Sequence, residues 1–494
     1  MEIISTKCIK WESFIVMVLC VILSFSTSCK NEDIVDSVNQ NLSEARKEQN
    51  WSLEVFKNMK DIYLWNDVLP STFDTVKYAT AESALNYLSG LKKNSSGVAI
   101  DRYSFLDKIG SLSSEISQGT ASGDYGFMVT GVLDSTTKVV SFVVNYVYKN
   151  SPAGLAGVAR SYEVVEINGS TDVHPTIGSD GYLETSSKAY QNMSNALFNS
   201  SSAKFTFKRP DGTTLDVSLN TGSYTINAVL CDSVYSVSSK KVGYVVFNQF
   251  LGTTAQTELT NVMTKFESKG VEYVIVDLRY NGGGAVSTCE MFSNLLAPKS
   301  ATAKVMYKYS MNAQQTSKYT TQSLITNYNK KNSFQPKAIY FIVGSRTASA
   351  SELLINNLRP YFPGNIYLIG KTTYGKPCGF WATPIGYTEK QTSTKEGYDL
   401  YAVSFSMVNA NGEGGYYSGM TPGSVQYPGT LAIDGLYPWA DTNDGCLSQA
   451  IYHVANGVFK SSKSANVKSL QTKTVFNTLD RQFNGMIDFR GKPF

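Results

Sequence analysis

The sequence predicts a multidomain α+β protein with a helical N-terminal region, a small β-domain, and an α/β core whose parallel-strand sheet is covered by helices. Three observations predict this order. Apolar residues recur at helical spacing before residue 110, and short β-prone runs separated by turns fill residues 111–222. From residue 223 onward, apolar strands alternate with helical patterns. The length of 494 residues is enough for roughly three domains.

The composition is that of an ordinary globular protein. Apolar residues make up 42% of the chain and charged residues 17%, a balance that favours packed cores over disorder. The formal net charge is only +4 and no long basic run occurs, so no nucleic-acid partner is predicted. The cysteines after residue 29 form no C-x-x-C pair, and only two histidines are present. Neither a disulfide framework nor a metal site is therefore predicted.

The N-terminus has the pattern of an export signal. Lys7 and Lys10 precede the apolar run Phe14–Leu23, which is too short to cross a membrane, because a helical span needs about 20 residues. Residues 1–28 are therefore predicted to be a signal peptide. Residues 29–50 are rich in Asn, Ser and Glu and are predicted to form a polar tether.

Cys29 ends the small-residue stretch "SFSTSCK", which resembles bacterial lipoprotein signals whose cysteine becomes the lipidated first residue. The resemblance implies a lipid anchor on Cys29 in the envelope of a Gram-negative bacterium. The acidic "KNED" that follows resembles the signal for the outer leaflet of the outer membrane, although a periplasmic face stays open. Ser26 stands where such signals usually carry leucine, and the alternative is a plain secretory signal with an incidental cysteine.

Residues 51–110 are predicted to be a helical N-terminal region. The first helix has apolar residues at helical spacing: Trp51, Val55, Met59 and Tyr63. Pro70 lies beyond the end of this pattern, where a helix cannot continue. A second helical pattern covers 81–91.

Residues 111–222 are predicted to be a small β-domain. Its β-prone runs are separated by turn signals, including Asp211-Gly212 between two strands, which is a hairpin signature. Ser151-Pro152 opens a short helix between two of the runs.

The order "YGF", "NSPAGLAG", "EVVEING" in this region resembles a PDZ domain. The resemblance implies that an extended peptide is added as a strand and that a backbone nest at Tyr125, Gly126 and Phe127 binds its terminal carboxylate. Ser161-Tyr162 replaces the Gly-Asp that usually precedes the last of these strands. An unrelated small β-domain is the alternative.

Residues 223–494 are predicted to form the α/β core and a C-terminal helical tail. Apolar strands such as "VEYVIVDL" and "KAIYFIV" alternate with helices, as expected for a parallel sheet covered on both faces. Two turns leave the carboxyl ends of buried strands, where open parallel sheets usually carry their sites.

The first turn is "DLRYNGGGAV", Asp277–Val286. Three consecutive glycines allow unusual backbone angles and a close approach of another chain. A phosphate loop would need Gly-Lys-Ser/Thr after the glycines, and a dinucleotide site would need glycine at Ser287. The better functional interpretation is a set of amide donors for an oxyanion. A tight turn without chemistry stays open.

The second turn is "GSRTASASELL", in which a helix starts near Ala348. A serine hydroxyl here lies close to unpaired backbone amides and to the positive end of the helix dipole, which favours an attacking alkoxide. Ser349 and Ser351 are the candidates. Both are equally compatible with the ordinary preference of serine for helix starts.

A serine nucleophile needs a base, and bases are scarce in this chain. His174 belongs to the β-domain, and His453 resembles a residue on the face of a C-terminal helix. A lysine can serve if burial lowers its pKa so that the amine is neutral. Lys376 is the candidate, because it lies among aromatic residues and no acidic residue occurs between Glu352 and Glu389.

"DLRYNGGG", "GSRTASASELL" and "GKTTYGK", in this order behind a PDZ-like region, resemble the C-terminal processing peptidases, or tail-specific proteases. The resemblance covers roughly residues 51–444. It implies Ser349 as nucleophile and Lys376 as general base. The oxyanion donors are then the amides of Gly283 or Gly284, together with that of Ala350.

This chain departs from the family pattern at two positions. Phe380 replaces a glutamine that orients the lysine in many members, and Gly423 replaces an aspartate that ends another motif. The resemblance still implies an exported serine endopeptidase that needs no cofactor and acts on an extended or unfolded polypeptide. The alternative is a catalytically inactive surface lipoprotein that binds a peptide or a glycan in the same groove.

Overall fold

The computed structural model describes residues 31–108, 111–134, 136–387, 396–422, 436–460, 472–477, 483 and 485–490. The predicted signal peptide, Cys29 and Gly423 lie outside these ranges. Within them, no helix combines the length and the apolar composition that a membrane span requires.

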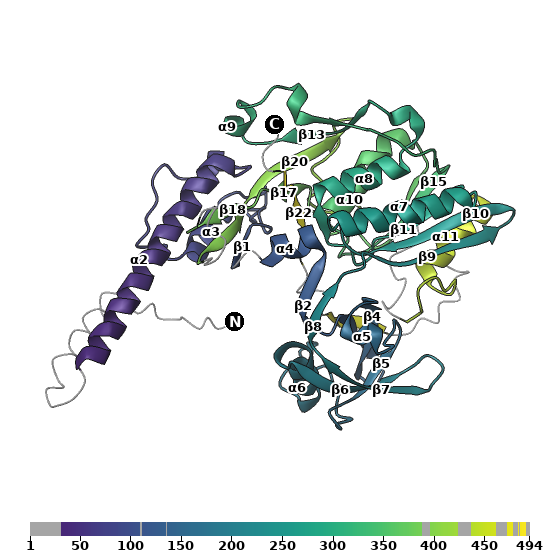
Figure 1. The fold of residues 1–494 in the computed structure, drawn as a ribbon, viewed down its shortest axis with the longest axis horizontal. Helices are drawn as coiled ribbons and strands as arrows, with labels where there is room; N and C mark the ends of the chain where they lie inside the picture. Colours follow the sequence, from purple (N-terminus) through teal and green to yellow (C-terminus); the bar gives the residue numbers. More distant parts are fainter. Residues whose placement is uncertain are drawn as a thin grey trace.

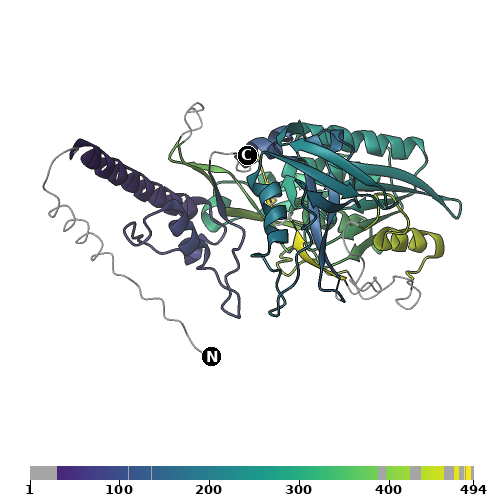
Figure 2. The ribbon, with the colours of Figure 1, turned by 90° about the horizontal axis from the view of Figure 1, so that it is seen from below.

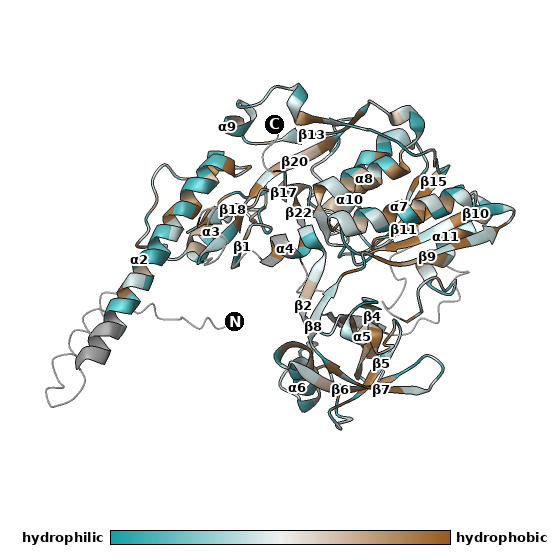
Figure 3. Ribbon diagram, in the orientation of Figure 1, coloured by the Kyte–Doolittle hydropathy of each residue, from teal (hydrophilic) through white to brown (hydrophobic). Residues whose placement is uncertain are grey.

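The N-terminal region is helical, as predicted, but its first helix is longer than expected. α2 covers Asn31–Ile62 and α3 covers Ala81–Ser89, with the short helix η1 at Asn66–Val68 between them. α2 thus runs through the stretch expected to be a tether. The cause lies in "SEARKEQ", a run of residues with good helix propensity. α2 is mostly hydrophilic along its length and projects from the rest of the protein (Figures 1 and 3).

A three-stranded sheet lies beside these helices, in the order β1-β19-β18. Its strands are β1 (Phe105–Lys108), β19 (Tyr398–Tyr401) and β18 (Thr383–Ile385). Their apolar residues share one buried cluster with α2 and α3. The N-terminal region is therefore packed against late parts of the chain.

The β-rich region forms a six-stranded antiparallel sheet, in the order β21-β3-β4-β5-β6-β7. Its strands are β3 (Phe127–Asp134), β4 (Val140–Val147), β5 (Glu163–Ile167), β6 (Ser202–Lys208), β7 (Thr214–Asn220) and β21 (Thr472–Asn477). Its helices are α5 (Pro152–Leu155), α6 (Lys188–Ser194) and the π-helix η2 (Asn195–Asn199). The predicted hairpin is confirmed, with Gly212 at a φ of 86° between β6 and β7.

The outer strand of that sheet comes from the C-terminal part of the chain. β21 pairs antiparallel with β3, from Thr472 opposite Asp134 to Asn477 opposite Thr130. β3 begins at Phe127, the last residue of "YGF", and the PDZ resemblance implies a peptide added as a strand in this domain. A segment of the protein itself therefore occupies this stretch of the edge of β3.

The core contains a five-stranded sheet in the order β16-β15-β11-β10-β9. Its strands are β9 (Val229–Val237), β10 (Lys240–Phe247), β11 (Tyr273–Asp277), β15 (Ala338–Val343) and β16 (Ile366–Gly370). Strands β10, β11, β15 and β16 are parallel to one another, as predicted for this alternating stretch, and β9 pairs antiparallel with β10. The predicted parallel arrangement is thus confirmed for four strands.

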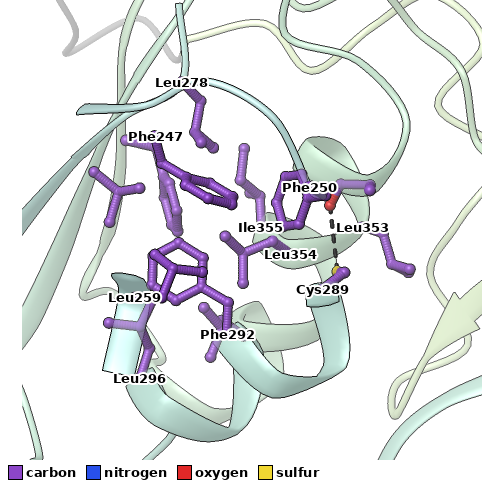
Figure 4. Packing of buried hydrophobic residues seen from close by; sticks show 14 of the residues in the cluster. Phe247, Phe250, Leu259, Leu278, Cys289, Phe292, Leu296, Leu353, Leu354 and Ile355 are labelled. Atoms are coloured by element: carbon purple, nitrogen blue, oxygen red, sulfur yellow. Dashed lines mark hydrogen bonds between the residues drawn. The ribbon is translucent and has the colours of Figure 1, made fainter. Parts of the chain in front are cut away.

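Helices cover both faces of this sheet (Figures 1 and 2). α7 (Thr253–Ser268), α8 (Val286–Leu296) and α10 (Ala350–Leu358) pack on one face, and α11 (Gly445–Asn456) packs on the other. Phe247, Phe292 and Leu354 fill the space between the sheet and the first three helices, and the Cys289 thiol donates to the Ala350 carbonyl there (Figure 4). This packing fixes the start of α10.

A second core sheet has the order β12-β22-β17-β20-β13-β14. Its strands are β12 (Gly283–Ala285), β13 (Val305–Ser310), β14 (Ile325–Asn327), β17 (Cys378–Phe380), β20 (Val403–Asn409) and β22 (Gly485–Ile487). β12 belongs to the triple-glycine turn, and its neighbour β22 is contributed from more than 190 residues later. The remaining elements are α4 (Ser111–Gln118), α9 (Ala313–Thr316), the two-stranded sheet β2 (Thr120–Asp124) with β8 (Gly222–Thr225), and the short helices η3 (Lys299–Ala301), η4 (Gln322–Leu324) and η5 (Arg359–Tyr361).

Candidate active site

The two predicted turns lie side by side at one edge of the parallel sheet. The first leaves β11 and the second leaves β15, and these strands are neighbours in the sheet. Carboxyl ends of adjacent parallel strands share one edge, which is where such sheets usually bind ligands. The sequence therefore located this edge correctly.

Three hydrogen bonds join the turns to each other. The Thr347 hydroxyl donates to the Leu278 carbonyl at 2.7 Å. The Asn281 carbonyl accepts from the amide of Ala348 at 3.1 Å and from the Ser351 hydroxyl at 3.1 Å. Ser351, one of the two candidate serines, thus has a structural bond that ties its helix to the other turn.

A buried ion cluster fixes the beginning of the first turn. The Arg279 guanidinium bonds to both carboxylate oxygens of Asp277 at 3.0 Å and to those of Asp444 at 2.7 and 3.1 Å. All three side chains are almost fully buried. Asp444 also caps α11, accepting from the amides of Cys446 and Leu447. The turn is therefore anchored to the helix on the opposite face of the sheet.

Ser349 has a strained backbone immediately before α10. Its φ of 58° and ψ of −107° are rare for a residue with a side chain, and such strain is concentrated at functional sites. The side chain is fully buried. Its hydroxyl donates to the Cys378 carbonyl over 3.4 Å, so it points toward the chain segment that follows Lys376.

Lys376 is buried, with an exposed fraction of 1%. Its Nζ lies 3.9 Å from the centroid of the Phe380 ring, 5.3 Å from that of Tyr103 and 5.7 Å from that of Phe483. Burial lowers the pKa of Lys376 to about 7, and the nearby carboxylates of Asp101 and Glu352 oppose this change. The rings also oppose it, because they attract the protonated amine.

Glu352 connects the segments that carry Ser349 and Lys376. One carboxylate oxygen accepts from the amides of Ser349 and Lys376, each at 2.8 Å. The other accepts from the amide of Gly375 at 2.8 Å and from the hydroxyl of Thr373. A single fully buried carboxylate therefore binds the backbone amides of both candidate catalytic residues. Burial raises its pKa, and these four hydrogen bonds oppose that change.

The amides proposed as oxyanion donors differ in their backbone surroundings. The amide of Gly283 donates to Asn281 Oδ1 at 2.9 Å, so an oxyanion would have to displace that side chain. Gly284 lies in β12 opposite Met486, with a φ of 134° that favours glycine. Ala350 is the first residue of α10, where amides have no partner within the helix. The oxyanion role stays a prediction for all three residues.

The predicted peptide-binding loop contains a carboxylate of its own. Gly126 has a φ of 79°, and its amide donates to Asp124 Oδ1 at 2.7 Å. Tyr125 and Phe127 are buried, and the Tyr125 hydroxyl donates to the Ser200 carbonyl. A peptide carboxylate at this loop would have to compete with Asp124, which the carboxylate-nest prediction did not anticipate.

A cavity of about 650 Å³ joins this loop to the core. Tyr125 and Phe127 line it from the β-domain, and Phe105 lines it from the N-terminal region. Gly282, next to the triple-glycine strand, and Phe483, which contacts Lys376, line its other side. The cavity therefore reaches from the predicted peptide loop to the turn with the candidate amides.

The histidines lie elsewhere. His453 is on α11, where its Nδ1 is 2.9 Å from the Tyr340 hydroxyl, and burial lowers its pKa. His174 belongs to the β-domain, at a position between β5 and α6. In the described residues neither histidine forms a hydrogen bond with Ser349, and the lysine base stays a prediction.

Sequence reasoning missed several residues of this site. Glu352 had a detectable signal, because Ser349 and Glu352 form the S-x-x-E pattern of a helix capping box. Asn281 had a weaker signal, as a polar residue directly before three glycines. Tyr103 and Phe483 had no signal in the sequence, because they are far from Lys376 along the chain and only the fold brings their rings close to its amine.

Family profiles match two parts of this chain. Residues 241–400 match the profile of peptidase family S41, and residues 47–105 match the peptidase S41 N-terminal domain. This chain therefore carries the domains of peptidase family S41, to which the C-terminal processing peptidases belong. Ser349 and Lys376 both fall within the matched core.

The relatives in sequence are distant. The carboxy-terminal processing protease CtpA of Bacillus subtilis is 25% identical over 229 residues, which are 46% of this chain and 43% of that protein. A CtpA-like serine protease of Staphylococcus haemolyticus is 25% identical over 205 residues, 39% of this chain and 38% of that protein. The matches thus span less than half the length of these relatives.

A solved structure shares the fold. The crystal structure of an S41 protease from Bacteroides fragilis aligns with a TM-score of 0.60 and 20% identity, covering 82% of this chain and 97% of that one. At this identity the likeness shows the architecture, a mixed α+β protein with a helical N-terminus.

Proposed function

We propose that this protein is an exported serine endopeptidase that cleaves polypeptides through Ser349 and Lys376. The observation that carries the proposal is the Glu352 oxygen that accepts from the amides of both residues. These bonds join the backbone of a buried lysine whose pKa is about 7 to that of a serine with a strained backbone, which supports the proposed pair. The proposed reaction needs no cofactor.

The reaction follows from the chemistry of these two groups. Ser349 Oγ attacks the peptide carbonyl carbon while the neutral Lys376 Nζ accepts the hydroxyl proton. The C–N bond breaks, the leaving amine takes that proton, and an acyl ester remains on Ser349. Water then gives a proton to the same amine and attacks the ester carbonyl, the C–O bond to Ser349 breaks, and Ser349 Oγ takes that proton as the acid product leaves. The start of α10, with the Ala350 amide and the helix dipole, stabilises the oxyanion of each step.

Substrate binding is assigned to the PDZ-like region, residues 111–222, together with the catalytic core, residues 223–494. An incoming chain that pairs along β3 has to displace β21 from Thr130–Asp134. The cavity offers a route past the other end of β3 to Gly282. We therefore place the substrate chain in the cavity, with its scissile bond at the triple-glycine turn.

The pH dependence of cleavage tests the identity of the base. Because only the neutral amine accepts a proton, kcat/KM is expected to rise with pH through about 7 and then level off, as the lysine loses its charge. A histidine base would titrate in nearly the same range. The profile should therefore be measured in parallel on a variant with both His174→Asn and His453→Asn. Retention of the step in this variant supports lysine, and its loss contradicts the proposal.

Export and anchoring are proposed from the sequence of the N-terminus. We place the protein in the envelope of a Gram-negative bacterium, held by a lipid on Cys29. Metabolic labelling with an alkyne fatty acid should label the full chain and its Cys231→Ala variant, but not Cys29→Ala, which is expected to leave the membrane fraction. Label on the Cys29→Ala variant would contradict the anchor. Protease treatment of intact cells then distinguishes the surface from the periplasmic face.

The rival function is a non-catalytic lipoprotein that binds a peptide or a glycan in the same cavity. It predicts binding without hydrolysis at any pH. It also predicts that replacement of Ser349 leaves every measured property of the protein unchanged.

A further inference from the structure

The cavity between the β-domain and the core has an acidic lining. Glu115 of α4, Asp124 of β2 and Asp107 of β1 contribute carboxylates to its wall. No lysine, arginine or histidine occurs among the described residues that line it. Burial raises the pKa of Glu115 and Asp124, as expected for carboxylates removed from water. A cation in the cavity would oppose that change, because an opposite charge favours the ionised form of these carboxylates.

Asn248 gives an independent sign that the cavity accepts a hydrogen-bond donor. Its side chain lines the cavity and is only 5% exposed. Its Nδ2 donates to the Tyr148 hydroxyl at 2.9 Å, whereas its Oδ1 accepts no hydrogen bond from any residue that the structure describes. A buried acceptor without a donor is costly, so a donor brought by a ligand would stabilise this oxygen.

The loop at the mouth of the cavity disfavours an anion. Asp124 Oδ1 accepts from the amide of Gly126 and from the Tyr224 hydroxyl, each at 2.7 Å. The amide that a peptide carboxylate would use is thus already paired with a carboxylate. A second negative charge beside Asp124 would be repelled.

The arrangement suits an organic cation better than a metal ion. Throughout the described ranges, no group of three or more His, Cys, Asp or Glu side chains is placed to hold a metal. The rings of Tyr125, Phe127 and Tyr148 form much of the remaining wall. Aromatic faces attract ammonium and guanidinium groups, and the apolar stems of lysine and arginine pack on such rings.

We infer that this cavity binds a lysine or arginine side chain of the polypeptide being cleaved, so that the protein selects basic segments near the scissile bond. The inference rests on the proposed peptidase function, because Gly282 places the cavity beside the triple-glycine turn. Glu115 and Asp124 pair with the cation, and Asn248 Oδ1 accepts one of its donors. These three residues determine specificity without touching the reacting atoms.

Paired peptide series test the inference. One series of unstructured, otherwise neutral fluorogenic peptides carries a single arginine at successive positions, and the matched series carries citrulline, its neutral isostere. At one position the arginine peptide is expected to have a kcat/KM about tenfold or more above that of the citrulline peptide. A double variant, Glu115→Gln with Asp124→Asn, should lose this preference, so that its kcat/KM is the same for the arginine and citrulline peptides.

The control variant is Asp211→Asn, which makes the same kind of charge change on the exposed β6–β7 turn and should keep the preference. Equal rates for the two series in the unaltered protein, or a preference that survives in the double variant, would overturn the inference.

A binding measurement separates this inference from the proposed chemistry. Fluorescence anisotropy with the same labelled peptides is carried out on Ser349→Ala, which cannot cleave. Arginine peptides are expected to bind more tightly than citrulline peptides here too, and to lose this advantage when Glu115→Gln and Asp124→Asn are added. This result would support the cation site even if no peptide were cleaved by the unaltered protein. Equal affinities would overturn it.

Discussion

Replacing Ser349 with alanine or Lys376 with methionine is expected to abolish hydrolysis of an unfolded protein substrate. The expected loss in kcat is on the order of 10⁴-fold or more, because the nucleophile and its base act as one unit. The alanine has no hydroxyl to attack the carbonyl, and the methionine cannot accept its proton. Gel-based cleavage of a denatured substrate and a fluorogenic peptide assay give the two measurements.

Matched controls distinguish chemistry from folding. Ser345→Ala and Lys371→Met alter exposed residues close in sequence to the catalytic pair and should keep full activity. Lys376→Met is expected to raise the free energy of unfolding between pH 7 and pH 10. In this range the Lys376 amine is neutral in the folded protein but protonated in the unfolded chain. This proton uptake favours the unfolded state, and methionine, which does not titrate, removes that contribution. Unchanged cleavage by folded Ser349→Ala or Lys376→Met would refute the proposed pair.

Glu352→Ala is expected to lose both stability and activity. The change leaves three buried amides and the Thr373 hydroxyl without their acceptor. The free energy of unfolding should fall by about 3–5 kcal/mol, since buried donors that lose a charged partner are costly. Urea unfolding measures this loss. Activity should be assayed well below the unfolding midpoint, where the remaining defect reports the misplacement of Ser349 and Lys376.

Glu82→Ala provides the comparison for this variant. Glu82 also lies in the first turn of a helix, α3, but is exposed, so its loss should change stability by no more than about 0.5 kcal/mol. A folded Glu352→Ala protein with normal kcat would show that the shared carboxylate does not position the catalytic pair.

The sequence predicted the strand-helix alternation and the sheet edge that holds the site. Parallel pairing of β10, β11, β15 and β16 follows from apolar strands with helices between them, which is a strong local signal. The two turns could be placed together because each follows such a strand. The roles of Ser349 and Lys376 came from motif resemblance, since neither residue alone differs from an ordinary helix start or an ordinary lysine.

Other features depend on contacts that local patterns do not encode. Phe380 occupies the position of the glutamine that orients the lysine in many family members. The rings of Phe380 and of Tyr103, which belongs to the N-terminal region, lie close to the Lys376 amine instead. The pairing of β21 with β3 depends on tertiary structure. The hydrogen bond from the Gly126 amide to Asp124 depends on the geometry of one loop. The PDZ resemblance stays a prediction, and it gave no sign that the edge of β3 and the Gly126 amide are already engaged.

The position of β22 sets an order of events during folding. Gly283–Ala285 in β12 gains its neighbouring strand only from residues 485–487, about 200 positions later. Contacts between such distant segments form late, because a long loop must close first. In a chain that folds as it emerges on the far side of a membrane, the triple-glycine turn lacks this neighbouring strand until almost all of the residues have crossed. Under the export that we propose, the sheet that contains the triple-glycine turn is therefore completed only after the chain has crossed the membrane.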